Sequence, residues 1–251
     1  MNSSEWLALA IGNSRLHWAW FRKGAIVTAW DSPHSPPEFA TLEFACQKAN
    51  LTPEVDLADL PLYIASVVPA QTELWLNQPR STLLTLDAIP FQGLYPTLGI
   101  DRALALWGAA VRYGLPALAI DGGTALTFSG ANAQQEFIGG AILPGLGLQR
   151  RSLSDQTAAL PFVKSNDAPP RWAKSTAEAI QSGIFYTALA GIREFVQDWR
   201  QQFGKGAIVL TGGDAELLMD GLTTQYPELL EALSIDSHLI FWGMQAIVER
   251  S

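Results

Sequence analysis

The sequence has 251 residues, of which 48% are hydrophobic and 16% charged, and it can form one large domain or two smaller ones with a proper core. A formal net charge of −8 argues against a general binder of nucleic-acid backbones, which needs clustered Lys and Arg. The single cysteine, Cys46, excludes an internal disulfide, and without a signal-like N-terminus or a membrane-length apolar run we expect a cytoplasmic protein with no membrane partner.

The first half of the chain begins with three predicted strands. Their apolar runs span residues 6–10, 16–21 and 25–30, and the turns between them are Gly12-Asn13-Ser14 and Arg22-Lys23-Gly24. Apolar spacing then predicts a helix at 38–48, a strand at 62–68, a helix at 70–76 and a strand at 81–87. Strands followed by alternating helices and strands indicate an α/β fold.

A further helix is predicted to begin near Asp101 and to end at Tyr113-Gly114. A carboxylate in a first helical turn interacts favourably with the helix dipole, so Asp101 suits a purely structural cap and Arg102 a solvated charge. A functional role for Asp101 requires this helix end to face the glycine turns of the chain.

The second half begins again with strands, which run from Leu115 to about Leu143. Between two of them lies Asp121-Gly122-Gly123-Thr124, which suits either an ordinary hairpin turn or a ligand site. In a ligand site, Thr124 and the turn amides would hold a phosphate oxygen and Asp121 a neighbouring cation. The glycine-bounded segment 139–145 either exposes amides to an anion or is a crowded crossing, and a helix follows at 146–153.

Two helix starts in the second half carry clear signals. Ser175-Thr176-Ala177-Glu178 is a capping box that opens a long helix to about Gln202, and small residues on one face of this helix predict a core or dimer contact. Thr211-Gly212-Gly213-Asp214 ends a short strand and opens another helix, a geometry typical of adenine-nucleotide sites. The last predicted helix spans 239–249.

The opening pattern of the chain occurs twice. Residues 7–14 align without gaps on residues 118–125, and in both copies an apolar strand enters a glycine turn with a hydroxyl or amide residue and then a second strand. Such a repeat predicts a duplicated fold, with residues 1–113 and 114–251 as its two lobes and one ligand held between them.

Together, these motifs resemble the type III pantothenate kinase family over nearly the whole chain. The resemblance rests on segments 11–14, 66–69, 99–102, 121–125, 139–145, 175–183 and 211–214, and Gly99-Ile100-Asp101-Arg102 is among its most specific parts. The sequence of residues 94–102 resembles that of a cyanobacterial branch of the family. The resemblance implies an α/β fold of two duplicated actin-like (ribonuclease H-like) lobes, each a mixed five-stranded sheet flanked by helices, with a cleft between them.

The resemblance also implies an activity and the residues that serve it. The activity is ATP-dependent phosphorylation of pantothenate, the first step toward coenzyme A, in a homodimer, with Asp101 as the general base. Asp121 matches the family's ligand for a monovalent cation, K⁺ or NH₄⁺. The implied pantothenate contacts are Gly99, Ile100, Asp101, Arg102 and Thr176. The implied ATP contacts are Ala10, Ile11, Gly12, Asn13, Ser14, Arg15, Leu16, His17 and Thr124.

The sequence departs from the family pattern at Ala10, where the first phosphate loop usually begins with Asp. That Asp would help to place the Mg²⁺ that accompanies ATP, and alanine cannot. The family's aromatic pantothenate contact has two candidates, Phe91 and Tyr95. Ala10 therefore leaves an alternative open, a catalytically weak or regulatory accessory protein on the same scaffold.

Overall fold

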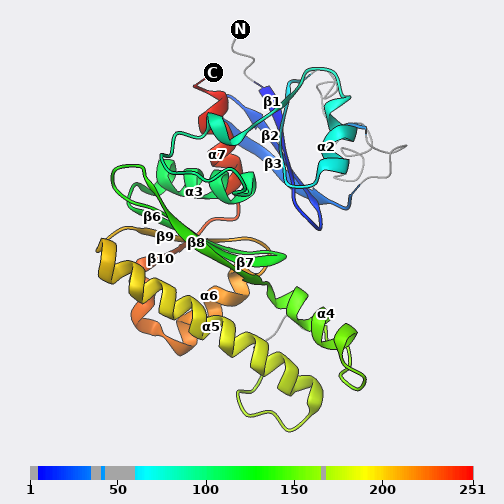
Figure 1. The fold of residues 1–251 in the computed structure, drawn as a ribbon, viewed down its shortest axis with the longest axis vertical. Helices are drawn as coiled ribbons and strands as arrows, with labels where there is room; N and C mark the ends of the chain where they lie inside the picture. The colour runs from blue at the N-terminus through cyan, green and yellow to red at the C-terminus, as the bar shows by residue number, and fades with distance from the viewer. Residues whose placement is uncertain (1–4, 35–40, 43–59, 165–167, 251) are drawn as a thin grey trace. The chain divides into compact units, whose positions relative to one another are not determined.

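The computed structural model describes residues 5–34, 41–42, 60–164 and 168–250. They divide into two compact units (Figure 1), the first from residues 1–90, 94–108 and 240–251 and the second from residues 91–93 and 109–239. The helix expected at 38–48 lies outside the described residues apart from Thr41 and Leu42, and Cys46 lies outside them as well.

The first unit is built on one sheet. Its strands are β1 (Glu5–Ile11), β2 (Leu16–Arg22), β3 (Ala25–Ser32), β4 (Leu62–Ser66) and β5 (Ser81–Leu83), in the order β3-β2-β1-β4-β5. The first three strands are antiparallel neighbours, whereas β4 and β5 continue the sheet in parallel. β1 and β2 are apolar almost throughout because nearly every residue in them is buried.

Helices complete the first unit. Trp75 of α2 (Pro69–Leu76) meets the ring of Trp18 edge-on in the core, and the short helix η3 (Leu86–Ala88) follows β5. The larger helices α3 (Ile100–Tyr113) and α7 (Leu239–Val248) cross closely, because Gly243 lies against the backbone of Leu104 where any side chain would overlap it.

The last helix corrects the expected division of the chain. A lobe of residues 114–251 would include α7, yet residues 240–251 belong to the first compact unit. The Trp242 ring packs edge-on against Phe21, and Gln245 Nε2 donates to the Gly24 carbonyl over 2.8 Å. These contacts with the β2–β3 hairpin, together with the α3 crossing, hold α7 in the first unit.

The second unit repeats the strand order of the first. Its sheet consists of β6 (Ala117–Gly122), β7 (Ala125–Ala131), β8 (Phe137–Pro144), β9 (Ala207–Thr211) and β10 (Leu233–Ile235), in the order β10-β9-β6-β7-β8. Again three antiparallel strands are extended by two parallel ones. The two sheets confirm the predicted duplicated α/β fold with a mixed five-stranded sheet in each half.

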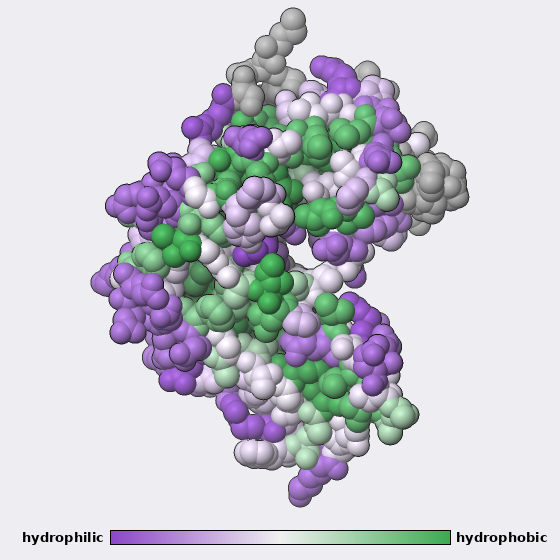
Figure 2. Space-filling model, viewed as in Figure 1, coloured by the Kyte–Doolittle hydropathy of each residue, from purple (hydrophilic) through white to green (hydrophobic). Residues whose placement is uncertain are grey.

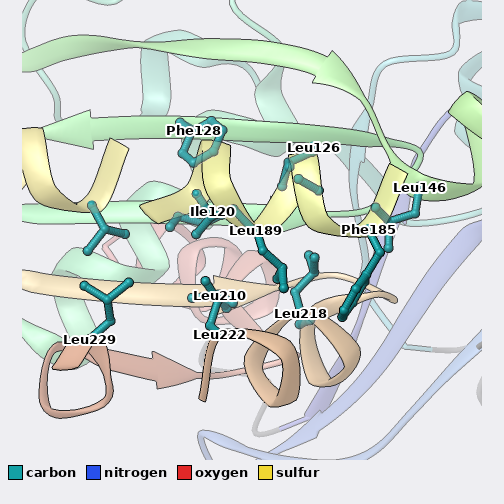
Figure 3. Close-up of a cluster of buried hydrophobic side chains, with 14 of the residues drawn as sticks. Ile120, Leu126, Phe128, Leu146, Phe185, Leu189, Leu210, Leu218, Leu222 and Leu229 are labelled. Atoms are coloured by element: carbon teal, nitrogen blue, oxygen red, sulfur yellow. The ribbon is translucent and has the colours of Figure 1, made fainter. Parts of the chain in front are cut away.

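Helices of the second unit cover one face of its sheet. They are α4 (Leu146–Gln156), α5 (Thr176–Phe203) and α6 (Ala215–Gln225), and η4 (Pro227–Ala232) leads into β10. Figure 3 shows Phe185 and Leu189 of α5 pointing toward Leu218 of α6, beside Ile120 and Leu210 of the strands. Burying such large apolar side chains supplies most of the stabilisation of this unit.

The surface mixes polar and apolar residues, as the visible face in Figure 2 shows. Among the large apolar side chains that stay exposed, Trp172 is 88% and Ile142 63% accessible. In the described part of the chain, no helix has both the length and the hydropathy needed to cross a membrane.

Candidate active site

The first glycine turn connects β1 to β2 and presents polar groups to solvent. Ile11 pairs with Leu16 as the last strand pair, and the Gly12 amide closes the turn by donating to the Arg15 carbonyl over 3.0 Å. Asn13, Ser14 and Arg15 are exposed, whereas Ala10, Ile11 and Leu16 are buried. Of the predicted ATP contacts in this segment, the turn residues and the partly exposed His17 are therefore accessible.

Charged side chains surround this turn. His17 Nδ1 donates to Asp31 Oδ1 over 2.7 Å, and Arg15 Nη1 lies 3.7 Å from Asp31 Oδ2. The hydrogen bond from His17, followed by the charges of His17 and Arg15, lowers the pKa of Asp31. His34 Nε2 donates to the Gly12 carbonyl over 2.8 Å. Sequence reasoning missed Asp31 and His34, which it left in a loop without a partner.

Asp101 lies in the first turn of α3 with its carboxylate folded back onto the helix start. Asp101 Oδ1 accepts a hydrogen bond from the Arg102 amide over 2.8 Å and occupies the space that a side chain on Gly99 would need. Burial raises the pKa of Asp101, while the amide and the charge of Arg102 oppose that rise. A carboxyl group with a raised pKa is a stronger base than an exposed aspartate.

The start of α3 lies at the same edge of the sheet as the first turn. The Val67 amide donates to the Ile11 carbonyl over 3.1 Å, which extends the parallel pairing of β1 and β4 to their carboxyl ends. A Cβ built on Gly99 would lie 3.7 Å from Val67 Cγ1. The structure thus links Ile11, Val67 and Gly99 within the first unit, at the edge where open α/β sheets hold ligands.

Arg102 is a buried residue, which excludes the interpretation of a solvated charge. It is 8% exposed, and its Nη1 donates to the Tyr95 hydroxyl over 3.1 Å. Tyr95 is 41% exposed, whereas Phe91 is 7% exposed. Tyr95 is therefore the more accessible of the two aromatic candidates for a substrate contact.

The second glycine turn holds Asp121 between two glycine segments, Gly122-Gly123 and Gly212-Gly213. Side chains added to Gly212 or Gly123 would meet Asp121 Oδ1, and Gly212 has a φ of +89°, which favours glycine. The Asp214 amide donates to the Gly122 carbonyl over 2.8 Å. The structure thus brings the ends of β6 and β9 together around one carboxylate.

Gly145 lies on the same turn and decides between two interpretations of segment 139–145. Its amide donates to the Thr124 carbonyl over 3.0 Å, and a side chain there would overlap the Gly123 carbonyl. Gly145 is therefore a crowded crossing that supports the second turn, and its own amide is already bonded.

The donor groups of the second turn limit which cation fits. Within the described ranges no group of three or more His, Cys, Asp or Glu side chains could hold a metal ion. A single carboxylate among backbone carbonyls suits a monovalent cation, or a Mg²⁺ held mostly by substrate phosphates. Burial raises the pKa of the neighbouring Asp214, and the charge of Arg150 opposes that rise.

Thr176 lies in the first turn of α5, where the predicted capping box is confirmed. The Ser175 hydroxyl accepts from the Glu178 amide over 3.3 Å and donates to Glu178 Oε2 over 2.9 Å. Thr176 itself is exposed. The loop before the helix is fastened to α5, because Ser182 Oγ donates to the Arg171 carbonyl over 2.7 Å.

Comparison with solved structures supports the fold. A protein from Campylobacter jejuni described as a Baf family transcriptional activator is 21% identical, with a TM-score of 0.62, over 97% of this chain and 98% of its own. MreB 5 of Spiroplasma citri, solved with AMPPNP bound, is 10% identical, with a TM-score of 0.52, over 100% of this chain and 97% of its own. At these identities the likeness concerns the fold alone, which is that of actin-like proteins and sugar kinases.

Comparison with sequences supports the family. Residues 6–198 match the family model described as type III pantothenate kinase. A protein from Nostoc sp. named type III pantothenate kinase is 46% identical over 98% of this chain and 95% of its own length. The chain therefore belongs to the type III pantothenate kinase family.

Proposed function

We propose that this chain transfers a phosphoryl group from ATP to the primary hydroxyl of pantothenate, the first step of coenzyme A biosynthesis. Family membership supports the reaction. The structural observation that carries the proposal is the half-buried carboxylate of Asp101 at the start of α3, whose pKa is raised by burial.

Asp101 acts as the general base in this proposal. Its carboxylate orients the pantothenate hydroxyl and accepts the proton that leaves as the new O–P bond forms. Gly99 leaves room for the carboxylate, and the Arg102 amide holds it. Because phosphoryl transfer depends mainly on positioning and charge stabilisation, a fixed carboxylate contributes most by orienting the hydroxyl.

Arg102 and its neighbours bind pantothenate in the same proposal. The guanidinium of Arg102, held by Tyr95, is suited to the carboxylate of pantothenate. Gly99 and Ile100 supply backbone beside it, and Thr176 is a second contact. A homodimer forms along α5, where side chains added at Gly183 or Gly191 would meet no other described residue within 4 Å, so that a second copy can approach closely.

ATP and its cations use the two glycine turns. Residues 10–17 form the first phosphate loop and Thr124 contacts ATP from the second. Asp121 holds K⁺ or NH₄⁺, and Mg²⁺ accompanies the ATP phosphates. Bound cations supply positive charge for two anionic substrates in a chain of net charge −8. We also propose a cytoplasmic location, where ATP is available.

A coupled assay tests this proposal. Purified protein with ATP, Mg²⁺ and K⁺ should release ADP only when pantothenate is added, and the product should be 4'-phosphopantothenate by mass spectrometry. Binding of both ligands without turnover would instead support the regulatory alternative that Ala10 left open.

A further inference from the structure

A row of three side chains crosses the first sheet beside the Gly12 turn. Ala10 of β1 lies opposite His17 of β2, and His17 lies opposite Asp31 of β3. Directly opposed residues in neighbouring strands share one face of the sheet. The row therefore sets an apolar residue, an imidazole and a carboxylate side by side at the end of β1.

The two ring nitrogens of His17 have different surroundings. Nδ1 donates to Asp31 Oδ1 over 2.7 Å, because an ionised carboxylate only accepts. Nε2 lies 3.6 Å from the position that a Cβ on Gly12 would take, so this edge of the ring is at the turn. The side chains of His17 and Asp31 are 43% and 47% exposed, which leaves both accessible to a ligand.

The charges around the turn favour an anion. Arg15 Nη1 lies 3.7 Å from Asp31 Oδ2, so Asp31 lies between Arg15 and the imidazole. Ala10 brings no charge, and His34 is bonded to the Gly12 carbonyl. Two basic groups and a turn of exposed polar residues suit phosphate oxygens, whereas a metal cation would be repelled by Arg15.

We propose that His17 donates from Nε2 to a phosphate oxygen of ATP, and that Asp31 is a positioning residue that orients the ring through Nδ1. The inference rests on the proposed use of ATP. It adds Asp31 to the residues that serve the reaction.

Two substitutions at His17 separate the roles of its nitrogens. In His17→Asn the amide reaches about as far as Nδ1 and can still bond Asp31, whereas in His17→Gln it reaches about as far as Nε2 without charge. Asp31→Asn removes the positioning carboxylate. The matched control is Arg22→Gln, since Arg22 Nε pairs with Glu5 Oε1 over 2.9 Å at the other end of the same two strands.

We expect the KM for ATP to rise about tenfold in His17→Asn and in Asp31→Asn, as loss of one charge-assisted hydrogen bond predicts. His17→Gln should recover part of the ATP affinity, because its amide can still donate from about the position of Nε2. The KM for pantothenate should stay within about twofold in all three variants, as should both constants in Arg22→Gln.

The outcomes keep this inference distinct from the proposed function. A KM for ATP that matches wild type in both His17→Asn and Asp31→Asn overturns the inference and leaves the kinase proposal intact. If the wild-type protein does not phosphorylate pantothenate, the proposed function fails. Calorimetric titration then tests the inference separately. An affinity for Mg·ATP that is the same in His17→Asn, Asp31→Asn and wild type would overturn it.

Discussion

The two glycine turns occupy equivalent places in their sheets and carry different side chains. Each ends the central strand of a mixed sheet and returns as an antiparallel neighbour. The last strand pairs are Ile11 with Leu16 and Gly122 with Leu126, so the first turn is one residue longer. In the gapless alignment of the repeats, Ala10 stands where the second copy has Asp121.

That difference shows how two copies of one turn can suit ligands of different charge. Asp121 lies opposite Thr127 and among glycines, an arrangement suited to a cation. Ala10 lies opposite His17, beside Arg15 and Asp31, an arrangement suited to an anion. The backbone repeat conserves the position of each turn, and the side chains on the neighbouring strands decide which charge it attracts.

The largest loss of activity is expected from a substitution at Asp101, and the effects of substitutions in the two turns can be compared with it. Asp101→Asn should lower kcat at least ~10²-fold, as expected for a removed general base. The protein should fold normally, and steady-state kinetics beside circular dichroism checks both. Turnover like that of wild type would contradict the role of Asp101 and leave catalysis to the turns alone.

The same variant gives a stability prediction whose sign follows from the pKa. Because burial raises the pKa of Asp101, its ionisation opposes folding, and stability falls as the pH rises through the range between the unfolded and folded pKa values. Asp101→Asn should therefore unfold at the same or a higher temperature than wild type at pH 8. A lower melting temperature at pH 8 would show that the charged carboxylate is stabilised by its surroundings.

A second effect should distinguish the two turns directly. Asp121→Asn should lower activity at least roughly tenfold and abolish the response to K⁺ or NH₄⁺, since even outer partners of metal sites typically contribute that much. Asp220→Asn is the control, because Asp220 is exposed on α6 and carries the same charge. Activity of the wild-type protein that is indifferent to both cations would remove this role from Asp121.

The smallest effect is expected from making the first turn resemble the second. Ala10→Asp should tighten the dependence of activity on Mg²⁺ by a few-fold, because a carboxylate beside the ATP phosphates can help to hold the metal. Ala10 is 2% exposed, so the new charge should also lower the melting temperature without ligands. Ala25→Asp, at an exposed position of β3, is the control. An unchanged Mg²⁺ titration would mean that other groups already hold the metal.

Much of the fold was predictable because its signals are local. The strands and turns around Gly12 and Gly123 follow from apolar runs interrupted by glycine, and the start of α5 follows from the Ser175–Glu178 capping box. β10 was missed because three residues carry too little pattern, and it exists through parallel pairing with β9. β5 is likewise shorter than the predicted strand at 81–87 and gives way to η3.

The candidate site was predictable only in part. The sequence predicted Asp101 and Asp121 as site residues because each lies in a short motif of adjacent residues. It did not reveal that Arg102 is buried against Tyr95, or that Asp31 lies across a strand pair from His17. These partners are seven and fourteen residues apart, and neither spacing marks a contact until the loop and the strand register are known.

By itself, the sequence determined the repeat, the order of strands and turns and the family to which the chain belongs, because each depends on residues close together in the chain. The tertiary structure decided that α7 returns to the first unit and that Ala10, His17 and Asp31 form one row. Both depend on long-range packing and strand register, in which a shift of one residue would move a side chain to the opposite face of the sheet.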